Sequence, residues 1–189
     1  KDYSLGAGLF NSPWVGMANF KEIFLSPEML RVIGNTLYIS LLKLIGATAP
    51  PLLLSIFLYD MRMMRAKKVV QTVVYIPHFF SWVIIYAITY AFLNEEGLLS
   101  TWLGTSSSIL TDSDWFIPIV IITNIWKELG WGTILYLAAL SSVPPELYEA
   151  AKLDGAGPWQ RVWRITLPSI LTIVMYLLII NLGQILKNA

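Results

Sequence analysis

The chain has 189 residues, 56% of them hydrophobic and 13% charged, and its mean hydropathy is +0.64. This composition is more apolar than that of a soluble domain of the same length and indicates a multispanning membrane protein. The net charge of +1 offers no basic field for nucleic acid, and the absence of cysteine excludes disulfides, iron–sulfur ligation and cysteine nucleophiles.

The first stretch, residues 1–34, carries Trp14, Phe20 and Phe24 among glycine, proline and asparagine. Aromatic residues in such a setting favour the headgroup zone of a bilayer. We expect an external loop that contains a short helix lying at the interface.

Four apolar segments follow that are long enough to cross a membrane, for which roughly 20 residues are needed. We predict an all-α, polytopic membrane helix bundle that forms one domain over residues 1–189. The predicted spans are residues 35–59, 69–93, 116–140 and 170–186.

Prolines and charged residues interrupt these segments. Pro50 and Pro51 are predicted to kink the first span, because proline lacks an amide hydrogen and its ring clashes with the preceding turn. Pro77 lies early in the second span. Unpaired charges at membrane depth cost at least about 2.5 kcal/mol each, so the charged residues Lys43, Lys127 and Glu128 should face protein or water.

The loops between the predicted spans differ in charge. The link from 60 to 68 is rich in arginine and lysine and is predicted to be cytoplasmic, whereas residues 94–115 carry four acidic and no basic residues, as expected of an external loop. Residues 141–169 carry Lys152, Arg161 and Arg164 and are predicted to return to the cytoplasm.

The loop of residues 141–169 has helix signals of its own. Pro144 and Pro145 are followed by Glu146, a combination that favours a helix start. Gly155 is predicted to end this helix, since glycine accepts a left-handed backbone. A second helical stretch is expected from Pro158 to Pro168, where the last span begins.

This loop resembles the EAA signature of ABC importer permeases, with its identities at the family's spacing: Glu149, Ala150, Ala151, Gly155, Ile165, Leu167 and Pro168. The resemblance implies a coupling helix that binds in a cleft of a cytoplasmic ATPase. The residues predicted to couple to the ATPase are Glu149, Ala150, Ala151, Lys152, Asp154, Gly155, Ala156 and Gly157. Without the signature, an interfacial amphipathic loop with no partner would be the simpler interpretation.

The chain is also similar, more loosely, to carbohydrate-uptake permeases of the alginate and aldouronate types, in residues 12–20, 75–82 and 130–140. This resemblance implies six spans, one before Lys1 and one after Ala189, in a bacterial cytoplasmic membrane. It further implies a second homologous permease in a heterodimer, two cytoplasmic ABC ATPase subunits that bind ATP and Mg, and an extracellular or periplasmic solute-binding protein. The chain has no GxxxxGK phosphate loop, so the ATP chemistry is expected from another polypeptide.

Polar and aromatic residues within the spans are candidates for the substrate pathway, because aromatic faces stack on sugar rings and amides bond hydroxyls. They are Tyr86, Tyr90, Asn124, Trp126, Lys127, Glu128, Asn181 and Gln184, with Tyr38 and His78 as further candidates. For any one of them helix packing is the competing interpretation, and His78 is predicted to pack rather than to bind a metal. Lys127 is either a cation for an acidic sugar or is neutralised by Glu128 or a partner helix.

Three other functions compete with this interpretation. A secondary transporter would be expected to show internal repeats and an intramembrane carboxylate at a coupling-ion site, and only Glu128 lies well inside a span. A membrane enzyme would need a nucleophile motif, metal cluster or carboxylate pair, and none stands out, so no catalytic or metal residue is predicted. An ABC permease for another solute class, such as amino acids or metals, would share the EAA loop. The function favoured is oligosaccharide import by alternating access.

Overall fold

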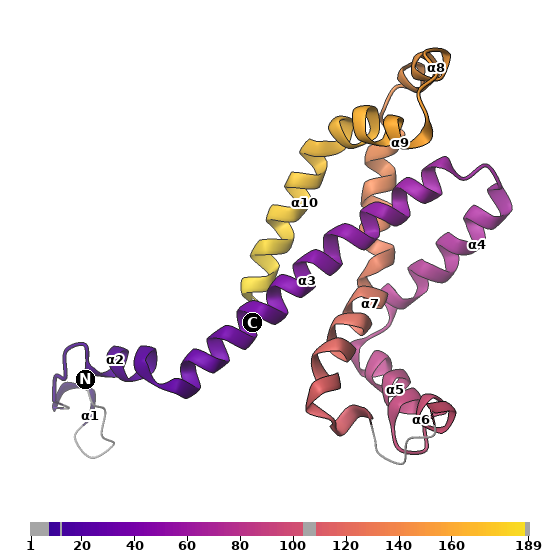
Figure 1. Ribbon diagram of the computed structural model, residues 1–189. Coiled ribbons are helices and arrows are strands. Elements are labelled where there is room, and N and C mark those ends of the chain that lie inside the picture. The colour runs from indigo at the N-terminus through magenta and orange to yellow at the C-terminus, as the bar shows by residue number, and fades with distance from the viewer. Residues whose placement is uncertain (1–7, 12, 104–108, 188–189) are drawn as a thin grey trace. The chain divides into compact units, whose positions relative to one another are not determined.

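The computed structural model of the chain describes residues 8–11, 13–103 and 109–187, and the regular structure in these ranges is helical (Figure 1). This confirms the all-α prediction. The elements in chain order are α1 (Gly8–Asn11), α2 (Ala18–Leu25), α3 (Pro27–Asp60), α4 (Met64–Tyr75), η1 (Ile76–Phe79), α5 (Trp82–Leu93), α6 (Leu98–Leu103), η2 (Ile109–Thr111), α7 (Ser113–Ser141), α8 (Pro145–Leu153), α9 (Pro158–Arg161), η3 (Val162–Thr166) and α10 (Leu167–Lys187).

The chain divides into two compact units, residues 1–39 and 40–189, and the boundary falls within α3. In the first unit, the long helix begins at Pro27 rather than at residue 35. Ser26 explains the early start, because its Oγ accepts a hydrogen bond from the Met29 amide at 3.1 Å and the proline occupies the first helical position. The expected loop of residues 1–34 is therefore helical in its last part.

Two helical runs of the described chain are long and apolar enough to cross a membrane, Pro27–Asp60 and Pro158–Gly183. A third candidate is the pair Met64–Phe79 and Trp82–Leu93, which is bent by 108°. Helix α7 is long enough but is less apolar than these segments, and it carries Lys127 and Glu128.

The second predicted span, residues 69–93, is not one helix. Pro77 lies in the short 3-10 turn η1, where its missing amide hydrogen ends the regular pattern of α4. Phe80 then adopts an extended conformation, and the Oγ of Ser81 caps α5 by accepting from the Ile84 amide at 3.4 Å. The sequence predicted an apolar segment correctly, but the structure divides it at residues 76–81.

The other proline positions do not end their helices. Helix α3 continues through Pro50 and Pro51. The last helical run continues through Pro168, because the π turn η3 precedes it and the Leu167 amide donates to the carbonyl oxygen of Val162, five residues back. A widened turn makes room for a proline ring that would clash in an α-helix. The fourth predicted span, residues 170–186, therefore belongs to a helical run that begins at Pro158.

Glycine lets the helices of the second unit approach α7 closely. A Cβ atom added at Gly132 would lie 2.8 Å from the Cβ of Pro51 on α3, and one added at Gly130 would collide with the backbone of Val74 on α4. Such contacts through small residues are the usual way in which membrane helices associate. At one end of α7, the buried residues Leu140, Val143 and Ile170 form a core that holds α8 to the bundle.

Candidate functional site

The turn after α8 has the geometry of a Schellman motif. The Ala156 amide donates to the Ala151 carbonyl at 2.8 Å, and the Gly155 amide donates to the Lys152 carbonyl at 3.1 Å. Gly155 lies at φ +76°, the left-handed region that favours glycine. The prediction that the helix ends at Gly155 is confirmed, and the reason for glycine is its backbone conformation, because a Cβ there would meet nothing within 4 Å.

The tip of α8 is strongly exposed. Leu153 is 90% exposed, and Glu149, Lys152 and Asp154 are exposed around it. An apolar side chain with a polar rim is the composition of a small protein-binding surface. The residues predicted to couple to an ATPase thus lie together on α8 and its C-terminal turn.

The opposite side of α8 is anchored. The hydroxyl of Tyr148 lies 3.1 Å from Oγ1 of Thr166 in η3, and its ring centre is 6.0 Å from that of Tyr59 at the end of α3. Tyr148 also packs on the core of Leu140, Val143 and Ile170. Helix α8 is therefore fixed to α3, α7 and the last helical run, and a displacement of α8 would move them with it.

A cavity of about 670 Å³ lies among helices of the second unit. Helix α3 contributes Ser40, Lys43 and Ala47, α7 contributes a stripe from Asn124 to Tyr136, and α10 contributes Tyr176 to Asn181. The spacings are those of single helix faces, as in Asn124, Glu128, Trp131 and Leu135. We call this space, which Trp82 of α5 completes, the central cavity.

One cluster of charges lies at the wall of the central cavity. The Nδ1 atom of His78 is 3.2 Å from Oε2 of Glu128, and Nζ of Lys127 is 3.7 Å from Oε1 of the same carboxylate. Lys127 is only 7% exposed; its Nζ also donates to the His78 carbonyl oxygen at 3.0 Å and lies 5.4 Å from the centre of the Trp82 ring. Lys127 and Glu128 are thus largely satisfied by protein groups.

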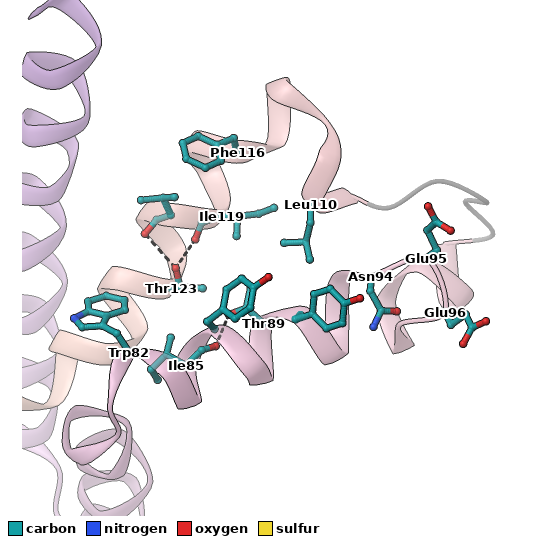
Figure 2. Close-up of a pocket in the computed structure, with 13 residues that line it drawn as sticks. Trp82, Ile85, Thr89, Asn94, Glu95, Glu96, Leu110, Phe116, Ile119 and Thr123 are labelled. Atoms are coloured by element: carbon teal, nitrogen blue, oxygen red, sulfur yellow. Dashed lines mark hydrogen bonds between the residues drawn. The ribbon is translucent and has the colours of Figure 1, made fainter. Parts of the chain in front are cut away.

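A second pocket of about 760 Å³ lies between α5 and the first part of α7, and we call it the outer pocket (Figure 2). Trp82 lines one end of it, and Glu95 and Glu96 lie at the other. The hydroxyls of Thr89 and Thr123 donate to carbonyls of their own helices, at 2.8 Å to Ile85 and 2.7 Å to Ile119. Because Trp82 lines both spaces, the outer pocket and the central cavity adjoin at this side chain.

The structure separates the predicted pathway residues. Tyr86 and Tyr90 line the outer pocket with ring centres 6.1 Å apart, whereas Asn124, Glu128 and Asn181 line the central cavity. Trp126 and Lys127 line neither space. Tyr38 belongs to the first unit, and the side chain of Gln184 lies outside the described residues.

Several lining residues were not predicted as pathway residues. Lys43, Trp82, Trp131 and Tyr176 all line the central cavity. Lys43 lies on the same helix face as Ala47, and Trp131 lies on the same face as Glu128. The helical period therefore indicated that each pair lines the same space, but it could not indicate which face lines a cavity. His78 stacks on Trp131 with ring centres 5.1 Å apart and planes at 8°, in accord with its predicted packing role. In the residues that the structure describes, no group of three potential metal-ligating side chains occurs.

Comparison with known proteins adds independent evidence. Residues 52–189 match the family model described as binding-protein-dependent transport system inner membrane component. Protein LplB of Bacillus subtilis (strain 168) is 44% identical over 192 residues, which cover 99% of this chain and 60% of that protein. The polygalacturonan/rhamnogalacturonan transport system permease protein YteP of the same strain is 41% identical over 192 residues, with 99% and 60% covered.

The sn-glycerol-3-phosphate transport system permease protein UgpA of Pectobacterium atrosepticum is 32% identical over 179 residues, which cover 91% of this chain and 59% of that protein. The chain thus spans about 60% of the length of these relatives.

Two solved structures are similar in both fold and sequence. A bacterial ABC transporter involved in the import of the acidic polysaccharide alginate matches with a TM-score of 0.85 and 42% identity, over 94% of this chain and 64% of that one. A bacterial alginate ABC transporter in complex with an alginate pentasaccharide-bound periplasmic protein matches with a TM-score of 0.84 and 42% identity, over 92% and 62%. The chain therefore belongs to the family of binding-protein-dependent transport system inner membrane components, as its resemblance to ABC importer permeases predicted.

Proposed function

We propose that this chain is a permease subunit of an ATP-driven importer that carries oligosaccharides across the bacterial cytoplasmic membrane by alternating access. The observation that carries the proposal is the connection of α8 to the cavity walls. Helix α8 lies between α7 and the run that ends in α10, and both of these helices line the central cavity. A push on α8 would be transmitted to the cavity as a rigid-body movement.

The partner for α8 is proposed to be a cytoplasmic ABC ATPase, one of two that bind ATP and Mg. The exposed Leu153 would enter a cleft of this subunit, with residues 149–157 forming the contact. A second, homologous permease would complete the pore and bring its own coupling helix to the other ATPase. The family is described as binding-protein-dependent, so a separate binding protein would deliver the sugar from outside.

The proposed topology has support from the packing. Tyr59, next to the basic link of residues 60–68, lies beside Tyr148 in the second basic loop, so the two predicted cytoplasmic loops share one end of the bundle. The acidic residues Asp112 and Asp114 of the predicted external loop lie at the other end of α7, where this helix begins (Figure 1). The outer pocket would then receive the sugar, and Trp82 would lie where it passes into the central cavity.

The substrate is proposed to be an acidic oligosaccharide of the alginate or uronate type. The central cavity offers aromatic rings and side-chain amides, which suit a sugar. One relative is a permease of a polygalacturonan/rhamnogalacturonan transport system, and one matched solved structure is a transporter involved in the import of the acidic polysaccharide alginate. A different anionic solute is the alternative, because another relative is a permease for sn-glycerol-3-phosphate.

The test is transport by the full-length protein with its partner permease, ATPase and binding protein in proteoliposomes. We expect ATP-dependent uptake of labelled alginate or galacturonate oligosaccharides and little uptake of glycerol-3-phosphate. Leu153→Asp should reduce both uptake and copurification of the ATPase, because a charge would enter an apolar cleft. Leu98→Asp is the matched control, since Leu98 is also exposed but lies at the other end of the bundle.

Two results would contradict the proposal. One is the absence of ATP-dependent uptake of any of these sugars by the wild-type importer. The other is full ATPase copurification and full uptake with Leu153→Asp, which would remove α8 from the coupling role.

A further inference from the structure

We propose that the central cavity holds a carboxylate-binding subsite for one uronate residue of the sugar, with Lys43 as its cation. The inference rests on the proposed function and identifies the group by which the pore would distinguish acidic from neutral sugars. It places this role on Lys43 rather than on Lys127, for which the sequence left open both sugar binding and neutralisation by Glu128 or a partner helix.

Lys43 is placed on the cavity face of α3. Ser40, Lys43 and Ala47 are three and four residues apart, so they share one face of the helix, and all three line the central cavity. The approach of α3 to α7 is fixed nearby by the contact of Pro51 with Gly132. This close contact keeps the helix face that carries Lys43 turned toward the residues of α7 that line the cavity.

The ammonium group of Lys43 is available. The residue is half-buried and forms no ion pair with any residue that the structure describes. An unpaired charge at membrane depth is unfavourable, and a bound anion would offset part of this cost. The site is therefore favourable for a group of opposite charge.

The acid in the same cavity does not compete for Lys43. The carboxylate of Glu128 lies 3.2 Å from Nδ1 of His78 and 3.7 Å from Nζ of Lys127, whose ammonium group offsets its negative charge. Without these partners Glu128 would attract Lys43 and repel a uronate. Because Glu128 is already in contact with His78 and Lys127, Lys43 faces the cavity as a cation without a partner among the described residues.

The surroundings of Lys43 suit a sugar ring. Trp82, Trp131 and Tyr176 line the cavity, and these residues are about half exposed, at 53%, 48% and 59%. Asn124 and Asn181 add amides that can donate to or accept from hydroxyls. A cation, aromatic faces and amides within about 670 Å³ form a site for a carboxylated sugar rather than for a simple anion.

The test is equilibrium binding to the assembled permease and ATPase complex, followed by tryptophan fluorescence. The probes are alginate and galacturonate pentasaccharides and the same sugars with their carboxyl groups reduced to alcohols. Wild type should bind an acidic probe about tenfold more tightly than its reduced form, as expected for a charged hydrogen bond. Lys43→Met should remove this preference, Lys43→Arg should retain most of it, and Lys43→Glu should reverse it.

Lys68→Met is the matched control, because Lys68 is exposed on α4 and does not line the central cavity. Equal affinities of wild type for acidic and reduced probes, or an equal change of both with Lys43→Met, would overturn the inference. Loss of the second permease from the purified Lys43→Met complex would also overturn it, since Lys43 would then be an ion-pair partner across the heterodimer. Failure of ATP-dependent uptake by wild type is a separate result, and it would remove the proposed function together with this inference.

Discussion

The Nζ atom of Lys127 on α7 donates a hydrogen bond to the backbone carbonyl oxygen of His78 at 3.0 Å, at the break between α4 and α5. A helix that ends leaves carbonyl groups without partners inside the helix, and a lysine can satisfy one of them. The same ammonium group lies near Glu128. This arrangement favours a structural role for Lys127, as a support for the broken segment, over a role in sugar recognition.

Lys127→Met is expected to destabilise the permease by about 1–3 kcal/mol, because the His78 carbonyl and Glu128 both lose a buried donor. For a chain of this size, each kcal/mol corresponds to about 2–4 °C in melting temperature. The measurement is thermal unfolding in nanodiscs, with Lys152→Met, at an exposed position of α8, as the control. An unchanged melting temperature for Lys127→Met would count against the supporting role.

His78 and Glu128 should be energetically coupled. A double-mutant cycle with His78→Ala and Glu128→Gln is expected to give an interaction energy of about 0.5–3 kcal/mol, because the two side chains are in contact at 3.2 Å. The stability of each variant is measured by the same thermal unfolding. Additive effects of the two substitutions would indicate that the contact contributes nothing to the fold.

Gly155→Ala is expected to strain the turn after α8 by about 1–2 kcal/mol, because its φ of +76° is unfavourable for a residue with a Cβ. The predicted readout is loss of coupling, with ATP hydrolysis continuing while sugar uptake falls. Gly155→Asn should retain more coupling, since asparagine tolerates the left-handed region. Gly157→Ala is a second control, because φ there is −68° and a Cβ would meet nothing within 4 Å. If sugar uptake per ATP hydrolysed were equal in all three variants, the backbone conformation of Gly155 would not be the reason for glycine at this position.

Gly132→Ala is expected to destabilise the bundle by about 1–3 kcal/mol, because the new Cβ would lie 2.8 Å from Cβ and 2.9 Å from Cγ of the Pro51 ring. A proline ring within a helix cannot rotate away as a flexible side chain can. Gly34→Ala, where a Cβ has open space, should be neutral or stabilising by about 0.5–1 kcal/mol. Comparable melting temperatures for the two variants would refute the close contact of α3 with α7.

Some features were predictable because their causes are local in the chain. Apolar content fixed the all-α membrane class, and the signals of Pro145 and Gly155 gave the bounds of α8 closely. Helix caps depend on residues within one turn, so a single sequence contains the information. The same holds for the family signature around Gly155, whose turn is built from hydrogen bonds between neighbouring residues.

Other features depended on contacts between distant segments. A proline within an apolar segment permits a kink, a break or a continuous helix, and the chain has a break at Pro77 but none at Pro168. At Pro77 the broken backbone is supported by Lys127, about 50 residues away, a contact that no local pattern specifies.

The sequence by itself determined the membrane class, the family and the turn that presents α8, since these follow from composition and from neighbouring residues. Only the tertiary structure decided which lysine is paired and which faces the central cavity. Lys43 and Lys127 are equivalent as charges in apolar segments. Lys127 is paired because α7 packs against the η1 turn, whereas Lys43 faces the central cavity, which α3 and α10 both line. The direction in which a helix face points is set by the packing of its neighbours.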